Sequence, residues 1–164
     1  MNEDREVASL LLDDQLCFAV YAASHAVTAA YRPMLDELGL TYPQYLTMLV
    51  LWERGELPVK ELAAALRLDY GTVSPLLKRL EAAGLVQRVR APHDERSVLV
   101  TPTEEGRALR LRARAVPQTL LATSGMAPSE VARLRGDLHR LAARVRAVPR
   151  TGLFLPPGNP PASA

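Results

Sequence analysis

The chain has 164 residues, of which 48% are hydrophobic and 23% charged, and its formal net charge is +2. These proportions are ordinary for one globular domain and argue against a chain that is disordered throughout. The sequence has no run of about eighteen apolar residues that could cross a bilayer, and its N-terminus is acidic where a secretory signal would be basic. We therefore expect a cytoplasmic protein that has no contact with a membrane.

The numbers of cysteines and histidines exclude several kinds of site. A single cysteine, Cys17, cannot form an intramolecular disulfide or a multi-cysteine metal site. The three histidines, His25, His93 and His139, lack the spacing of metal ligands. We expect no metal and no cofactor, and we expect the histidines to be surface or packing residues.

The first elements expected along the chain are two helices. Residues 13–31 repeat apolar side chains at helical spacing, with Asp13 as a suitable N-cap and Pro33 as a bend or stop. A second helix is expected after Thr41, because Thr41 and Gln44 have the spacing of a capping box.

The next segment has the two helices of a helix-turn-helix. A short amphipathic helix over residues 59–66 should support a second helix, whose apolar side chains recur at spacings of three and four. Asp69 is a suitable N-cap for the second helix. Pro75 is acceptable only in a first turn, so this helix is expected to begin near Thr72 or Ser74.

A β-hairpin should follow the helix pair and complete a winged helix-turn-helix. Gly84 is typical of a helix C-terminus, and the alternating sequences over 85–90 and 97–101 predict two strands with a tip at 92–96. Proteins built in this way bind duplex DNA, although helix pairs with a hairpin also occur in domains that bind only protein.

The distribution of charge supports binding to DNA. Residues 1–14 carry a net charge of −4, so the rest of the chain carries +6. Basic side chains neutralise phosphates and release counterions, whereas groups on the second helix would read base edges. The candidate DNA-binding residues are Asp69, Tyr70, Thr72, Ser74, Lys78, Arg79, Arg88, Arg90 and Arg96. An architectural protein that binds all duplexes equally remains an alternative, and a competition titration at fixed salt would separate the two.

The C-terminal part is expected to be helical and then disordered. Residues 103–105 open an arginine-rich helix that Pro117 should kink, and a last helix should start after residues 128–130. Residues 149–164, with five prolines and two glycines, should form a disordered tail. The terminal helices have apolar surface to spare, which favours a homodimer. Its operator would be a pseudo-palindrome with half-sites about 34 Å apart or a multiple of this distance.

Over residues 7–148 the chain resembles the MarR family of bacterial transcriptional regulators. The segment DERSVLVTPTEEG, residues 94–106, is similar to the wing signature of this family, in which an aspartate steadies the wing and an arginine reaches into the minor groove. The resemblance implies these roles for Asp94 and Arg96. It also implies a mainly α fold with a small β-wing, formed as one domain over residues 1–148. The winged helix-turn-helix would lie at about 57–102, and dimerisation helices at about 8–38 and 103–148.

Two stretches, DQLCFAVYAASHAVTAAYRPMLDELGLTYPQYLTMLVLWE and LDYGTVSPLLKRLE, are similar to one subgroup, the organic hydroperoxide resistance regulators. These proteins repress a peroxidase gene until an organic hydroperoxide oxidises one N-terminal cysteine. The resemblance implies that Cys17 is the sensing cysteine and that Tyr31 and Tyr42 form hydrogen bonds to it. A resolving cysteine is absent from this sequence, so a low-molecular-weight thiol, a sulfenamide or further oxidation must stabilise the induced state.

The position of Cys17 agrees with this chemistry in part. A first-turn position favours a thiolate, whereas Asp13 and Asp14 oppose it. In one continuous helix the Cα atoms of Cys17 and Tyr31 would be about 21 Å apart, so a contact between them needs the partner subunit. The two first helices would then pack antiparallel.

Two other functions remain open. A reversible aromatic ligand could lodge between the first helix and the winged part, with Cys17 as inert packing. A thiol peroxidase would use Cys17 as its nucleophile, but a resolving cysteine, a nearby general base and strands around the cysteine are all lacking. We therefore expect a regulator that is not an enzyme.

Overall fold

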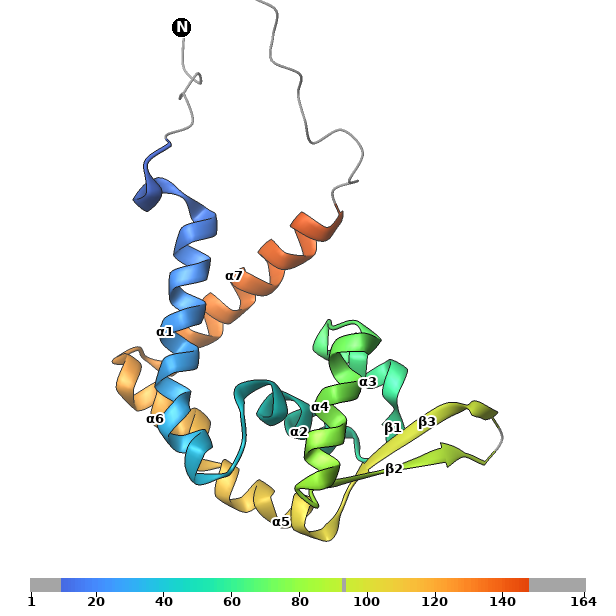
Figure 1. Ribbon diagram of the computed structural model, residues 1–164. Helices are drawn as coiled ribbons and strands as arrows, with labels where there is room; N and C mark the ends of the chain where they lie inside the picture. Colours follow the sequence, from blue (N-terminus) through green and yellow to red (C-terminus); the bar gives the residue numbers. More distant parts are fainter. Residues whose placement is uncertain (1–9, 93, 148–164) are drawn as a thin grey trace, which may run out of the picture. The chain divides into compact units, whose positions relative to one another are not determined.

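The computed structural model describes residues 10–92 and 94–147, without the side chains of residues 94–96, and it divides into two compact units. The first unit ends at Leu120 and the second begins at Leu121. The first contains η1 (Leu12–Asp14), α1 (Leu16–Glu37), α2 (Tyr42–Arg54), β1 (Leu57–Pro58), α3 (Val59–Leu66), α4 (Tyr70–Ala82), β2 (Val86–Ala91), β3 (Asp94–Pro102), α5 (Glu104–Ala113) and the start of α6 (Ala115–Ser124). The described part of the second unit holds the end of α6 and α7 (Pro128–Ala147) (Figure 1).

The boundaries predicted for α1 are wrong at both ends. The N-cap is Gln15, because Asp13 lies in the preceding 3-10 turn and cannot cap the helix. The helix also continues through Pro33 to Glu37. Pro33 lacks the N–H that would bond the carbonyl of Ala29, and Ala29 is exposed, so water can solvate that carbonyl. Leu35 is 2% exposed and holds the last turn in the core.

The start of α2 is as predicted. Thr41 and Gln44 form a capping box, in which the Thr41 N–H donates to Oε1 of Gln44 at 2.8 Å. The helix ends at Arg54 and its C-cap is Gly55, whose φ of 71° is unfavourable for other residues. The face of α2 that packs on the core includes Met48 and Leu51, which are 0% and 1% exposed.

The second helix of the predicted helix-turn-helix, α4, begins earlier than predicted. Oδ1 of Asp69 accepts the Thr72 N–H at 2.8 Å, which confirms Asp69 as the N-cap and starts the helix at Tyr70. Pro75 therefore lies in the second turn, contrary to the expectation that it would need the first. The only intrahelical bond it removes is to the carbonyl of Gly71, which is exposed at the end of the helix. Gly84 follows the helix with φ at 73° and supplies the predicted C-terminus.

The wing is part of a three-stranded antiparallel sheet in the order β1-β3-β2 (Figure 1). The predicted hairpin is β2 and β3, with Arg88 opposite Val100 and a register shift at Arg90/Ala91. The strand β1 was not predicted, because two residues are too short to show alternation. It pairs with β3, with Leu57 opposite Val100 and Pro58 opposite Leu99.

The core of the first unit lies between α2, α3, α4 and the sheet. Its largest fully buried side chains are Met48, Leu51, Leu62, Leu77, Leu80, Val73, Val86, Val100 and Thr47. Burying a Leu or Val side chain contributes roughly 1.5–3 kcal/mol, so this cluster fixes the arrangement of α3, α4 and the wing. The Thr47 hydroxyl donates to the carbonyl of Pro43 at 2.9 Å, which satisfies its polar group.

The C-terminal part is helical as predicted, but two helix boundaries differ from the prediction. The arginine-rich helix is interrupted at Arg114, between α5 and α6, so that Pro117 lies in the first turn of α6. The last helix starts at Pro128 itself, where a proline has no hydrogen bond to lose. The predicted tail at 149–164 lies outside the described residues. None of the helices in the described part is long and apolar enough to span a membrane.

Candidate DNA-reading surface and sensor

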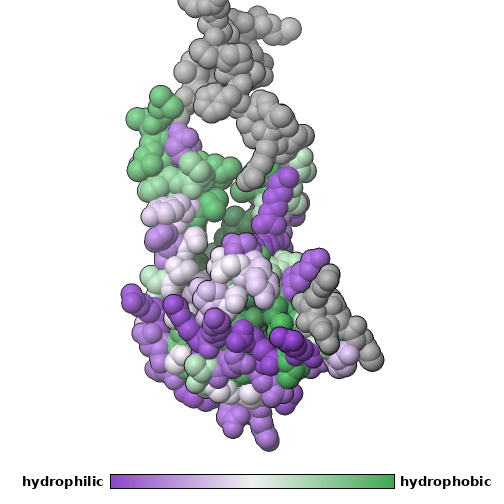
Figure 2. All heavy atoms as spheres, turned by 45° about the vertical axis from the view of Figure 1, so that its right-hand side comes forward, coloured by the Kyte–Doolittle hydropathy of each residue, from purple (hydrophilic) through white to green (hydrophobic). Residues whose placement is uncertain are grey.

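The recognition helix buries its apolar side and presents polar groups on its other faces. Val73, Leu77 and Leu80 are 0% exposed, whereas Lys78 and Arg79 are exposed. The hydrophilic surface over the winged part is visible in Figure 2. This arrangement leaves cations where phosphates could contact them.

Residues near the start of α4 have two roles, because some of them cap the helix and others are candidates for contact with DNA bases. The Thr72 hydroxyl donates to Oδ2 of Asp69 at 2.8 Å. Hydrogen bonds from the Thr72 side chain and backbone hold the pKa of Asp69 below its usual value. Asp69 and Thr72 are thus tied to each other as a cap. Tyr70 is 58% exposed and Ser74 is half-buried, so both remain candidates for base contact.

In the wing, Arg88 is held by a carboxylate that was not considered in the sequence analysis. Its Nη2 and Nε donate to Oε2 of Glu81 at 2.5 and 3.0 Å, and its backbone N–H donates to Oε1 at 3.2 Å. The side-chain bond from Arg88 lowers the pKa of Glu81. Arg88 therefore joins α4 to β2, whereas Arg90 is exposed. The side chains of Asp94 and Arg96 lie outside the described residues, so their roles stay predictions.

The root of the wing is bonded to the start of α5. The Thr103 hydroxyl donates to the carbonyl of Gly84 at 2.6 Å and accepts the N–H of Gly106 at 3.1 Å. Nε1 of Trp52, on α2, donates to the carbonyl of Gly106 at 2.7 Å. Sequence reasoning missed Trp52 and Glu81, because their partners are 54 and seven residues away and no local pattern indicates either contact.

The candidate sensing cysteine lies at the exposed start of α1. Cys17 is the second residue of the helix and is exposed. Tyr31 is on the same continuous helix, fourteen residues later, which is about 21 Å at 1.5 Å per residue. The prediction that the two residues cannot touch within one chain is therefore confirmed for this geometry.

Tyr31 belongs to a cluster of tyrosines between α1 and α2. Its ring centroid is 5.6 Å from that of Tyr42 and 5.9 Å from that of Tyr45. Burial, and secondly the neighbouring Tyr42, raise the pKa of Tyr31, so its hydroxyl keeps its proton and can donate. Burial raises the pKa of Tyr45 to about 12. The structure thus brings Tyr31 and Tyr42 together but places Cys17 far from both.

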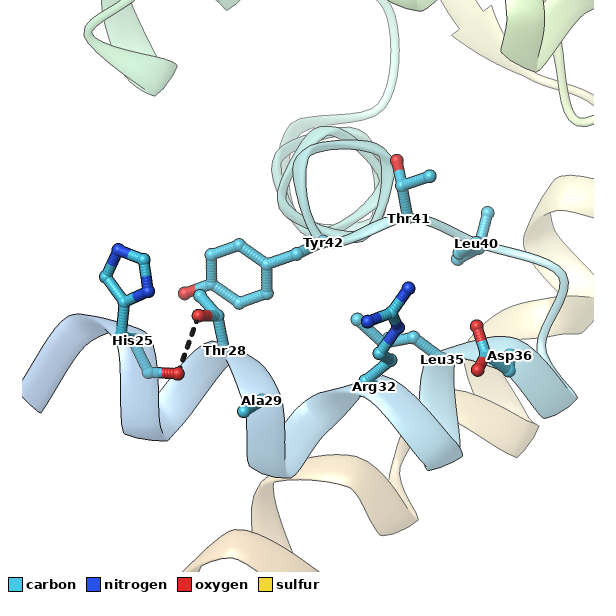
Figure 3. A pocket seen from close by; sticks show the side chains of 9 residues that line it. All are labelled: His25, Thr28, Ala29, Arg32, Leu35, Asp36, Leu40, Thr41 and Tyr42. Atoms are coloured by element: carbon cyan, nitrogen blue, oxygen red, sulfur yellow. Dashed lines mark hydrogen bonds between the residues drawn. The ribbon is translucent and has the colours of Figure 1, made fainter.

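A cavity of about 460 Å³ lies beside this cluster, between α1 and α2. Figure 3 shows the Tyr42 side chain reaching from α2 toward Thr28 and His25 of α1, with Arg32 on the far side. The lining combines apolar groups such as Leu35 with the polar groups named here. The cavity is large enough for a small organic molecule.

The N-terminal half of α1 is covered by exposed apolar side chains, as Figure 2 shows at that end of the helix. Leu16 is 61% exposed, Tyr21 is 58% exposed and Val20 is 40% exposed. Contiguous apolar surface of this kind marks an interaction site. Within the described residues, no cluster of histidine, cysteine or carboxylate side chains could hold a metal ion.

Comparisons with known proteins match the chain to transcriptional regulators. A family profile described as the transcriptional regulator SarA/Rot matches residues 29–110. The chain is 45% identical over 130 residues to the organic hydroperoxide resistance transcriptional regulator of Bacillus subtilis, and the alignment covers 79% of this chain and 88% of the relative.

Solved structures show the same fold. A MarR family transcriptional regulator from Rhodococcus sp. RHA1 superposes with a TM-score of 0.73 at 29% identity, covering 82% of this chain and 96% of that one. Reduced and overoxidized AbfR of Staphylococcus epidermidis, both bound to DNA, superpose with a TM-score of 0.67 at 31% identity, covering 82% of this chain and 94% of theirs. This chain belongs to the MarR family of transcriptional regulators, within which it resembles the one-cysteine organic hydroperoxide resistance regulators.

Proposed function

We propose that the protein is a peroxide-sensing repressor, which binds a pseudo-palindromic operator as a homodimer and releases it when an organic hydroperoxide oxidises Cys17. The observation that carries the proposal is the arrangement of the sensor on α1. Cys17 is exposed at one end of the helix, and the protonated, half-buried Tyr31 lies with Tyr42 at the other end. The similarity to an organic hydroperoxide resistance regulator supports this function. AbfR, whose structures on DNA include a reduced and an overoxidized form, supports oxidation in a regulator of this fold but carries no argument for release.

The dimer would pair the two α1 helices antiparallel across a two-fold axis. This pairing covers the exposed Leu16 and Val20 and brings Cys17 of each subunit to Tyr31 and Tyr42 of the other. Hydroxyl groups that donate to the sulfur would stabilise the thiolate, which is the form that attacks a peroxide. Sensor and dimer interface would thus be the same place.

The oxidation step needs no further cofactor. The thiolate sulfur attacks the terminal oxygen of the hydroperoxide, an S–O bond forms and the O–O bond breaks. The sulfur loses two electrons as sulfenic acid, and the alkoxide leaves as an alcohol after taking a proton from water. The product places a polar group in a packed interface and removes the anion to which Tyr31 and Tyr42 donated. A low-molecular-weight thiol could then condense with the sulfenic acid, releasing water and forming a mixed disulfide.

The test compares wild type with Cys17→Ser on an operator duplex selected by the reduced protein from a random pool. Cumene hydroperoxide should release wild type and leave Cys17→Ser bound. Ala19→Ser is the matched control, because it adds the same side chain on another face of α1, and it should respond as wild type does. A Cys17→Ser protein that is released as readily as wild type would refute the sensor role.

The cavity of about 460 Å³ favours one second candidate, a MarR-type repressor released by a reversible small aromatic ligand with Cys17 as a structural residue. Tyr42 and Arg32 would provide polar contacts in that case. This candidate predicts that phenolic compounds release wild type and Cys17→Ser equally, at concentrations that leave the sulfur reduced.

A further inference from the structure

We infer that Trp52 is the positioning residue that transmits the state of the sensor tyrosines to the root of the wing. The inference rests on the proposed function, since it names how oxidation at the dimer interface changes DNA binding. Its support is a continuous set of contacts from Tyr42 to the α4–β2 turn, all within the first unit.

The first part of this path is a row of aromatic rings. Centroid separations are 5.6 Å from Tyr42 to Tyr31, 5.9 Å from Tyr31 to Tyr45, and 6.5 Å from Tyr45 to Trp52. The last pair is edge-to-face, with an interplanar angle of 69°. These separations lie within the range in which aromatic side chains attract one another. Tyr45 is 3% exposed, so it cannot move without moving its neighbours.

The second part is the hydrogen bond from Trp52 to α5. The indole Nε1–H donates to the carbonyl of Gly106 at 2.7 Å. Tryptophan has this single donor, and no other side chain combines an indole-sized ring with an N–H in that position. When Trp52 moves away, the Gly106 carbonyl loses the indole as a donor.

The third part is the close packing of Gly106 on the wing root. Gly106 is buried, and a Cβ placed on it would lie 2.1 Å from the carbonyl oxygen of Leu85. Thr103 adds a hydroxyl bond to Gly84 at 2.6 Å and a backbone bond from its N–H to the Leu85 carbonyl at 3.1 Å. The start of α5 and the α4–β2 turn therefore move as one body, and both the recognition helix and the wing leave from that turn.

These contacts assign a role to each redox state. In the reduced protein, the tyrosines that bind the sulfur hold Tyr45 and Trp52 in place, and the Gly106 bond holds the wing root in the DNA-binding position. Oxidation frees Tyr31 and Tyr42, the ring row shifts and the indole bond breaks. The indole bond is thus present in the reduced protein and absent in the oxidised protein. The free energy by which it favours the DNA-binding position is the coupling between the sensor and the DNA.

Operator affinity of the reduced and the oxidised homodimer, measured for wild type and Trp52→Phe, tests the inference. The affinity of the reduced protein divided by that of the oxidised protein should be about tenfold smaller in Trp52→Phe than in wild type, because phenylalanine keeps a ring but lacks the N–H. The rate at which cumene hydroperoxide oxidises Cys17 should not change. A merely structural tryptophan would weaken both redox states by the same factor and leave the ratio as in wild type, which would overturn the inference.

Tyr45 offers a matched pair of variants for the ring row. Tyr45→Phe keeps the ring and should keep the wild-type affinity ratio, whereas Tyr45→Leu removes the ring and should reduce the ratio as Trp52→Phe does. If Tyr45→Leu and Tyr45→Phe give the same ratio, the row carries no coupling.

Fluorescence gives a second readout on the unaltered protein, because Trp52 is the only tryptophan in the sequence. Oxidation of wild type should shift its emission as the indole bond breaks, and Cys17→Ser should show no shift. An unchanged emission spectrum in oxidised wild type that has released its operator would overturn the role of Trp52 while leaving the sensor intact. A response of Cys17→Ser equal to that of wild type would instead refute the proposed function itself.

Discussion

Arg88 binds Glu81 through its guanidinium and its backbone N–H, so its charge is matched within the protein. Arg90, two residues later on the same strand, is exposed. A cation that neutralises a phosphate contributes about −0.9 to the slope of log affinity against log salt. A cation held by a carboxylate positions the wing instead and contributes nothing to that slope.

We predict that Arg90→Gln makes the salt slope of operator binding less steep by about two units, since each subunit of the homodimer loses one cation, whereas Arg88→Gln weakens operator binding with the slope unchanged. Glu81→Gln should also weaken operator binding, because it removes the same ion pair between α4 and β2. The measurement is a titration of operator binding from low to moderate salt. A loss of slope in Arg88→Gln would show that Arg88 contacts a phosphate.

The ion pair of Glu81 and Arg88 also predicts a dependence of stability on pH. The folded-state pKa of Glu81 is lowered from its ordinary 4.5, so the stabilisation is complete above that pH and is lost as the pH falls through the folded value. Urea unfolding should therefore show wild type more stable than Glu81→Gln at pH 7, with the difference shrinking below pH 4.5. A difference that persists unchanged in acid would contradict this assignment.

Tyr31 and Tyr42 should affect oxidation more than DNA binding. Tyr31→Phe and Tyr42→Phe remove the hydroxyls that would donate to the sulfur but retain the packed rings. We expect slower oxidation of Cys17 by cumene hydroperoxide and largely unchanged operator affinity of the reduced protein. Stopped-flow oxidation and a gel shift measure the two effects, and equal damage to both would make the tyrosines structural.

At the scale of the elements, Gly106 allows α5 to lie against the α4–β2 turn. A Cβ at this position would be 2.1 Å from a backbone oxygen, whereas at Gly136, within α7, the nearest atom is the flexible end of Arg140 at 3.4 Å. Gly106→Ala should lower the free energy of unfolding by about 1–3 kcal/mol through overpacking. Gly136→Ala should raise it by roughly 0.5–1 kcal/mol, since alanine favours a helix interior. Denaturant unfolding that gave both changes the same sign would contradict this account.

Elements with local signals could be predicted from the sequence, and elements that depend on tertiary packing could not. The Thr41 capping box and the Asp69 cap were predicted because each involves residues three apart. Pro33 and Pro75 were misjudged because the carbonyls they leave unbonded belong to exposed residues. The strand β1 has two residues and exists only through β3.

The candidate site divides in the same way. Cys17, Tyr31 and Tyr42 were identified by resemblance, and the structure brings only the two tyrosines together. Glu81 and Trp52 were missed because charge and ring patterns in a sequence do not indicate which distant groups meet. Arg88 was predicted to contact DNA because the sequence does not show that Glu81 binds its guanidinium.

At the scale of the whole molecule, the account requires two chains with antiparallel α1 helices. Residues 17 and 31 lie about 21 Å apart on one helix, beyond the reach of a disulfide. In the Tyr31→Cys protein, mild oxidation should therefore link the new thiol to Cys17 of the partner subunit. Non-reducing electrophoresis should show a covalent dimer, and Tyr31→Cys combined with Cys17→Ser should remain monomeric on the same gel. Absence of the link in Tyr31→Cys would contradict the antiparallel arrangement.

The central claim is that oxidation of Cys17 releases the operator-bound homodimer, and it is tested most directly by measuring oxidation and release on the same sample. Reduced homodimer bound to its operator is titrated with cumene hydroperoxide, and each aliquot is divided between intact-mass analysis and a gel shift. We predict that the fraction of DNA released rises together with the fraction of chains that have gained one oxygen atom at Cys17. Release of the operator while Cys17 is unmodified, or full modification of Cys17 with the operator still bound, would contradict the account.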